Sequence, residues 1–115
     1  MADQVIAPVS VPVNKTTDAV TGVSLTAAND GVITPVSDKM VVILYDAGGA
    51  GGTVLIKAGT EGALSGQGDI TVTLGAGETK AICVESARVK ALSGTDKGKI
   101  RLDASANTTA WAYAL

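Results

Sequence analysis

The sequence has no histidine and only one cysteine, Cys83. The lack of histidine removes the commonest general base, proton switch and metal ligand from the chain. A single cysteine cannot form a disulfide within the chain, and there is no cysteine pair to hold zinc or carry out redox chemistry. With no histidine to activate it, Cys83 is predicted to be a small buried hydrophobic residue. We therefore expect neither an enzymatic function nor a cofactor.

Charge is also scarce, since charged residues make up 17% of the 115 residues and the net charge is −2. Lysine and arginine are scattered, so the chain lacks the basic face and stacking aromatics that are typical of nucleic-acid binding. The longest apolar run, Met40–Tyr45, is too short to cross a bilayer, and Met1–Ile6 does not resemble a signal peptide. We expect no nucleic-acid or membrane partner, and synthesis in a host cytoplasm.

Aromatic residues amount to 3% of the chain, and phenylalanine is absent. The core must therefore be built from valine, isoleucine, leucine and alanine, which suits the packing of one thin sheet on another. Trp111 and Tyr113 are two residues apart in an extended segment, so both rings lie on one face. That face either seals the core or packs on a partner, and we favour the core.

Short apolar segments alternate with turns from residue 22 onward, and no stretch has the period of a long helix. The run Lys39–Tyr45 (KMVVILY) is continuously apolar after its first residue, which is typical of a strand covered on both faces. These features predict an all-β domain over residues 21–115, a small β-sandwich or jelly roll. The expected strands lie around Val23–Ala27, Ile33, Lys39–Tyr45, Thr53–Lys57, Ile70–Leu74, Glu78–Glu85, Val89–Leu92, Gly98–Leu102 and Thr108–Tyr113.

Residues 1–20 read as an extended N-terminal arm, because valines alternate with small residues and two prolines. The alternative is a frayed tail. The valines are too apolar for a solvated linker, so we expect the arm to lie on a neighbouring subunit. The predicted partner-binding residues of the arm are Val5, Pro8, Val9, Val11, Pro12 and Val13.

The glycine-rich stretch Asp46–Gly52 (DAGGAGG) is expected to be a hairpin turn. It lacks the Gly-Lys-Ser/Thr sequence of a phosphate-binding loop, and Thr53 opens a strand rather than a helix. Its Gly49 and Gly51 are further candidates for close approach to a partner. Acidic residues at loop ends, Asp46 among them, do not have the spacing of a calcium loop and are expected to cap turns.

The order of these segments resembles a known family. The arm is followed by VSLTAANDGVITP, DKMVVILYDAGGAGGTVLIKAG, GDITVTLGAGETKAICVES and KIRLDASANTTAWAYAL. Over most of residues 22–115 this resembles the small all-β head decoration, or cementing, proteins encoded beside major capsid genes in tailed bacteriophages. The resemblance implies a virion structural protein that binds the outside of the capsid as a dimer or trimer, with the major capsid protein as its partner. It assigns no functional residue.

Two other functions remain open at this stage. A jelly roll can present loops to sugars, so a carbohydrate-binding or adhesin-like module on a virion or cell surface is the main alternative. Such a module predicts loop aromatics or a calcium cage, and the sequence contains neither plainly. A virion joining or tail component is a weaker possibility, which predicts ring-like assembly instead of binding to a lattice.

Overall fold

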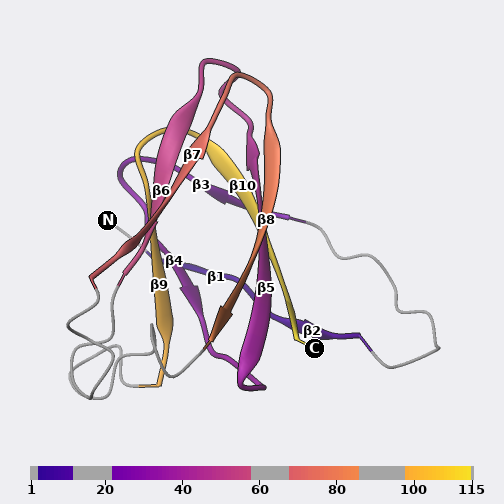
Figure 1. The fold of residues 1–115 in the computed structure, drawn as a ribbon. Coiled ribbons are helices and arrows are strands. Elements are labelled where there is room, and N and C mark those ends of the chain that lie inside the picture. The colour runs from indigo at the N-terminus through magenta and orange to yellow at the C-terminus, as the bar shows by residue number, and fades with distance from the viewer. Residues whose placement is uncertain (1–2, 12–21, 58–67, 86–97, 115) are drawn as a thin grey trace.

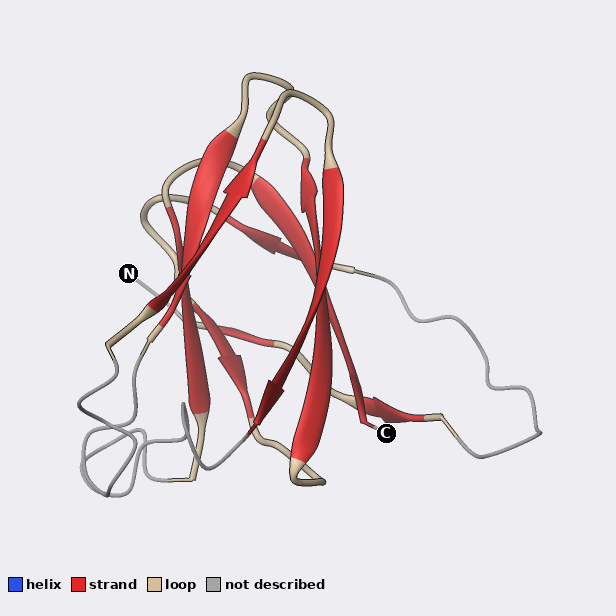
Figure 2. Cartoon of the chain, viewed as in Figure 1, coloured by secondary structure: helices blue, strands red, loops and turns tan. Residues whose placement is uncertain are grey.

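Ten strands in two facing sheets make up residues 3–11, 22–57, 68–85 and 98–114, the part of the chain that the computed structural model describes (Figures 1 and 2). Sheet A has the order β1 (Gln4–Val5), β4 (Gly31–Ile33), β9 (Ile100–Ala104), β6 (Gly52–Ile56) and β7 (Ile70–Leu74). Sheet B has the order β2 (Val9–Ser10), β10 (Thr108–Ala114), β5 (Lys39–Asp46) and β8 (Thr79–Glu85), with β3 (Val23–Leu25) also paired to β10. The predicted β-sandwich is confirmed.

The strand positions follow the alternation in the sequence closely. The strand predicted at Ile70–Leu74 has those bounds in the structure, and the strand predicted at Lys39–Tyr45 ends one residue later. The segment predicted at Gly98–Leu102 begins and ends two residues later, as β9. The strand expected at Val89–Leu92 lies outside the described residues. The turns after β5 and β7 cross between the sheets, since β5 and β8 lie in sheet B and β6 and β7 in sheet A. The hairpin turn expected at Asp46–Gly52 is therefore wrong, because β5 and β6 do not pair with each other.

The core lies between the sheets and is built from aliphatic side chains at alternate strand positions. In β5, Met40, Val42 and Leu44 point inward and are fully buried, whereas Val41 and Ile43 between them are only partly buried. The expectation that both faces of this strand are covered is therefore wrong within the single chain. A run that is apolar on both faces has only one of them buried in the core.

The described N-terminal residues are extended and pair with the sheets of their own chain. β1 lies parallel to β4 in sheet A, and β2 lies parallel to β10 in sheet B. The chain crosses from one sheet to the other at Pro8, and Ile6 before it is only 2% exposed. Arg101 on β9 holds the start of this segment, because its Nη1 and Nη2 donate to the two carboxylate oxygens of Asp3, at 3.0 Å each. Pro12 and Val13 lie outside the described residues.

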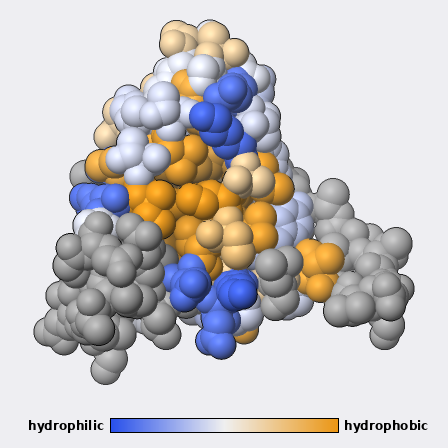
Figure 3. All heavy atoms as spheres, in the orientation of Figure 1, coloured by the Kyte–Doolittle hydropathy of each residue, from blue (hydrophilic) through white to orange (hydrophobic). Residues whose placement is uncertain are grey.

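One side of the sandwich is bounded by β7, the last strand of sheet A, and β8, the last strand of sheet B. Figure 3 shows hydrophobic residues gathered in the middle of this side, with hydrophilic residues above and below them. Ile70 on β7 and Ile82 on β8 are partly buried here and pack against the core. The core thus reaches close to the surface between these two edge strands.

Candidate binding surfaces

The outer face of sheet B is apolar and carries all three aromatic residues of the chain. Cross-strand pairing places Ile43 between Ala81 and Trp111, and Val41 between Cys83 and Tyr113. Tyr45 follows on the same face of β5 and is 39% exposed. We call this surface the aromatic face, and it consists of Val41, Ile43, Tyr45, Ala81, Cys83, Trp111 and Tyr113.

Two sequence predictions are corrected by this arrangement. The rings of Trp111 and Tyr113 share a face, as expected, but they are partly exposed on the outside and do not seal the core. The inward positions of β10 are instead occupied by Ala110, Ala112 and Ala114. Cys83, which was expected to be buried, is exposed. The reason is the fixed spacing between packed sheets, since large aliphatic residues on the facing strands already fill the gap and leave room only for small ones on β10.

The outer face of sheet A has a different character. Its central strands present Thr53 and Leu55 on β6 beside Arg101 and Asp103 on β9, and the edge strand β7 adds exposed threonines. Such a face is suited to contact with water, because its apolar residues Val5, Val32 and Leu55 stand among polar ones. The two outer faces of the same sandwich therefore differ in kind, and only that of sheet B resembles the centre of a protein interface.

Backbone packing holds the central ring of the aromatic face in place. Gly22 lies so close that a Cβ atom added to it would be 2.7 Å from Cε2 of Trp111 and 2.3 Å from Cγ2 of Thr109. Neither distance is compatible with a side chain at position 22, so glycine allows the backbone to lie against the indole. The Trp111 ring is thus fixed on one flank, which reduces the entropy lost when a partner covers it.

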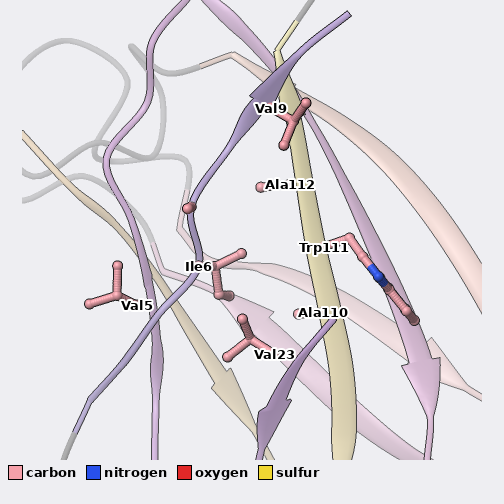
Figure 4. A pocket seen from close by; sticks show the side chains of 8 residues that line it. Val5, Ile6, Val9, Val23, Ala110, Trp111 and Ala112 are labelled. Carbon is pink, nitrogen blue, oxygen red and sulfur yellow. The ribbon is translucent and has the colours of Figure 1, made fainter. Parts of the chain in front are cut away.

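An apolar hollow of about 170 Å³ lies beside the aromatic face, at the edge of β10. β3 pairs with β10 only at residues 108–110 and β2 only at residues 113–114, so a gap remains between them along this edge. Figure 4 shows Ile6, Val9 and Val23 around this gap, with the Trp111 ring on the other side of the β10 ribbon. The hollow has room for one aliphatic side chain.

The structure describes four of the six predicted partner-binding residues of the arm, namely Val5, Pro8, Val9 and Val11. Val5 and Val9 line the hollow, so they lie near Trp111, a link that the sequence did not indicate. Val5 is 75% exposed and Val11 is 40% exposed, and Pro8 lies between them with intermediate exposure. Contact of these residues with a neighbouring subunit stays a prediction.

The glycines of the β5–β6 turn are explained by a buried carboxylate. Asp46, only 1% exposed, accepts hydrogen bonds from the backbone N–H of Gly51 at 2.8 Å and of Gly77 at 3.0 Å. Gly51 has a φ of 84°, and a Cβ there would be 3.0 Å from the carbonyl oxygen of Leu74. Gly49 has a φ of 79° with open space around it. Of the two glycines proposed for partner contact, Gly51 holds the turn and Gly49 is accessible.

Asp46 thereby fastens the β5–β6 turn to the β7–β8 turn, both of which cross between the sheets. The prediction that it caps a turn is confirmed, and the structure adds a second turn 31 residues away. The backbone N–H groups of Gly77 and Gly51 hold the pKa of the Asp46 carboxyl below its ordinary value, because they stabilise the ionised form. Glu78 beside it is similarly affected, since the Gly75 N–H and Lys80 lower the pKa of its carboxyl.

The lowered pKa of Asp46 predicts how stability depends on pH. A carboxyl whose pKa is lower in the folded state stabilises the fold above its unfolded pKa of about 3.9, and this contribution is lost as pH falls through the folded pKa. Asp46→Asn is expected to destabilise the protein at pH 7, because the neutral amide oxygen is a weaker acceptor for the Gly51 and Gly77 N–H groups than the ionised carboxylate. The difference from wild type should shrink below pH ~4. Urea unfolding between pH 7 and pH 2 measures it, and parallel curves across this range would contradict the assignment.

No group of three or more acidic or cysteine side chains is placed to hold a metal ion within the described ranges. Nor does that part of the chain contain a helix long and apolar enough to span a membrane. Comparison of the chain with models of protein families, with curated proteins and with solved structures finds no match. The aromatic face and the hollow beside it are therefore the candidate binding surfaces of the described residues.

Proposed function

We propose that this chain is a virion structural protein that binds the outside of a tailed-bacteriophage capsid and stabilises the shell. The aromatic face carries the proposal. β5 is apolar on both sides, and its own chain fully buries only one of them, which leaves the other available to a partner. Trp and Tyr are enriched where protein partners bind most strongly, and Trp111 and Tyr113 lie on this face beside β5. The resemblance of the segment order to head decoration proteins suggests the major capsid protein as that partner.

The size of the face indicates how such binding would work. Three strands about 4.8 Å apart and five residues at about 3.4 Å each give a flat area of roughly 200 Å². A stable interface buries about 800 Å² on each partner. The aromatic face alone is therefore the centre of a contact and not a complete one. The exposed Val11, which follows β2 in sheet B, would widen it, and an oligomer would bind the regular lattice of a capsid through several such faces at once.

Co-sedimentation with expanded capsids tests the proposal. We expect a major capsid gene beside the gene for this chain, and the capsids are assembled from the product of that gene without the chain itself. We expect the protein to pellet with them and to saturate at a fixed number of copies per capsid subunit, and the loaded capsids to resist heating better than bare ones. Protein that stays in the supernatant at every concentration would refute the proposal.

The N-terminal segment needs substitutions instead of a deletion. Removing residues 2–13 would also remove Ile6 from the core and the pairings of β1 and β2, so lost binding could reflect a damaged fold. Val5→Asp and Val11→Asp change exposed side chains and leave Ile6 in place. If the segment contacts the capsid or a neighbouring subunit, either variant lowers capsid occupancy at unchanged thermal stability. Full occupancy by both variants would exclude the segment from the interface.

One observation favours the carbohydrate-binding alternative. The three rings are spread along the aromatic face, Trp111 and Tyr113 about 7 Å apart on one strand and Tyr45 beyond them on the next. Partly exposed rings with neighbouring threonine hydroxyls are suited to stacking on sugars. A glycan array with and without calcium distinguishes the two functions. Binding to a glycan that Trp111→Ala abolishes, with no binding to capsids, would favour the alternative.

A further inference from the structure

β8 is the outermost strand of sheet B, and its outer edge has hydrogen-bonding groups that no described residue pairs. The orientation of these groups follows from the bond that the Asp46 N–H donates to the Glu78 carbonyl at 3.0 Å, since this pair continues the β5–β8 register by one step. In an antiparallel ladder the direction alternates from residue to residue. The backbone groups of Lys80, Ile82 and Val84 therefore point to β5. Those of Thr79, Ala81, Cys83 and Glu85 point away from the sheet.

A lysine of β8 covers the neighbouring edge of sheet A, whereas the edge-facing backbone groups of β8 have no partner among the described residues. Nζ of Lys80 donates a hydrogen bond of 2.6 Å to the Thr73 carbonyl on β7 and lies 3.4 Å from Oε1 of Glu78. An inward-pointing lysine is a common means of keeping an edge strand from pairing with other chains. Here it covers β7. β8 itself is exposed at all four positions of its outer face and at Lys80 on its inner face, and it contains neither proline nor glycine.

We propose that a second copy of this chain pairs with β8 through its own β8, antiparallel, with the two-fold axis at Ile82. This register sets Thr79 opposite Glu85 of the second copy and Ala81 opposite its Cys83. The edge-facing backbone groups of all four residues, Thr79, Ala81, Cys83 and Glu85, are then paired in each strand. A shift by two residues in either direction leaves one of the four unpaired, and a shift by one brings inward and outward side chains together. The proposed register is therefore the one that pairs every edge-facing backbone group of β8.

The side chains of β8 are compatible with such a partner. Ala81 and Cys83 would meet on the outer face, where both are small. Ile82, partly buried at the margin of the core, would meet Ile82 of the second copy and become fully covered. The charged residues Lys80 and Glu85 stand near opposite ends of the strand. Antiparallel pairing keeps the two lysines roughly 14 Å apart, whereas parallel pairing would set like charges side by side.

This pairing would join the two B sheets into one and set the two aromatic faces next to each other on the same side. Doubling the apolar surface supplies the avidity that a single face of roughly 200 Å² lacks. The contact between two strand edges is itself small compared with a stable dimer interface of about 800 Å² per partner. We expect a reversible dimer that dissociates on dilution.

Sedimentation equilibrium of the full chain over a concentration series tests the dimer. Ala81→Pro removes an outward N–H and leaves the bonds between β8 and β5 intact, because residue 81 does not bond to β5 in this register. It should raise the dissociation constant about tenfold or more, the equivalent of one or two net hydrogen bonds. Thr71→Pro is the matched control, because the backbone groups of Thr71, like those of Thr73, point away from the neighbouring strand β6. It should leave the dissociation constant unchanged.

Cysteine cross-linking tests the register with variants that keep the strand intact. Ala81→Cys places a cysteine opposite Cys83 of the second copy, where Cα atoms about 5.5 Å apart permit a disulfide. Mild oxidation should therefore give a covalent dimer. Thr79→Cys should give none, because its cysteine would be offset by two residues from Cys83 of the second copy, too far for a disulfide. Cross-linking by Thr79→Cys and not by Ala81→Cys would overturn the register.

A monomer at every concentration, a trimer, or an Ala81→Pro variant as dimeric as wild type would overturn the dimer itself. No capsid is present in these assays, so their outcome is separate from that of the proposed function. A monomer that still saturates capsids would leave the capsid-binding proposal intact and remove only the pairing of β8. A dimer that does not bind capsids would refute the capsid-binding proposal and leave the pairing of β8 intact.

Discussion

Ile43→Lys is expected to lower binding to expanded capsids at least about 30-fold, the effect of losing ~2 kcal/mol at the centre of an interface. Ile43 lies in the middle of the aromatic face, between Ala81 and Trp111. A partner covering this face would have to desolvate the lysine ammonium without a paired charge, which is costly. The fold should persist, because a long side chain on the outer face of a strand can extend into water.

The matched control is Leu55→Lys. Leu55 lies on the outer face of sheet A, partly buried like Ile43, and the change adds the same charge to the protein. It should leave capsid binding unchanged. Occupancy is measured by co-sedimentation, and circular dichroism checks the fold of both variants. Equal loss of binding in the two variants would mean that charge and not location matters, and would refute the assignment of the aromatic face.

Leu44→Ala is expected to reduce the free energy of unfolding by about 2–5 kcal/mol, through lost burial and the cavity left behind. Leu44 is fully buried at the centre of β5, which has strands on both sides in sheet B. A domain of this size has a free energy of unfolding of about 5–15 kcal/mol, so the variant should be only marginally stable. Urea unfolding followed by tryptophan fluorescence measures the loss, because Trp111 is the only tryptophan.

Ile43→Ala is the comparison within the same strand. It removes a side chain of similar size from the neighbouring position, which faces outward and is only partly buried. We expect a loss of roughly 1 kcal/mol, within the range of substitutions on exposed strand faces. Similar losses at positions 43 and 44 would show that the outer face is covered in solution. A second copy would be one such cover, and the loss at 43 would then depend on protein concentration.

The positions of the strands could be predicted because they follow from local chemistry. Alternation in Ile70–Leu74 and glycine at the turn before Thr79 limit the backbone to few conformations, whatever the rest of the chain does. The capping role of Asp46 was predicted on the same basis. Its second partner, the N–H of Gly77, could not be predicted, since it depends on how two turns far apart in sequence pack together.

By itself, the sequence determined that the chain is all-β, that it lacks histidine chemistry, and which residues of each strand share a face. The period of two in a strand predicts that Trp111 and Tyr113 lie on the same face, but it does not predict which face of the sheet is buried in the core. The tertiary structure decided that question. The space between the sheets is filled by large aliphatic residues from both, so β10 turns its alanines inward and its rings outward. Packing volume, which depends on all strands at once, placed the aromatic residues where a partner can reach them.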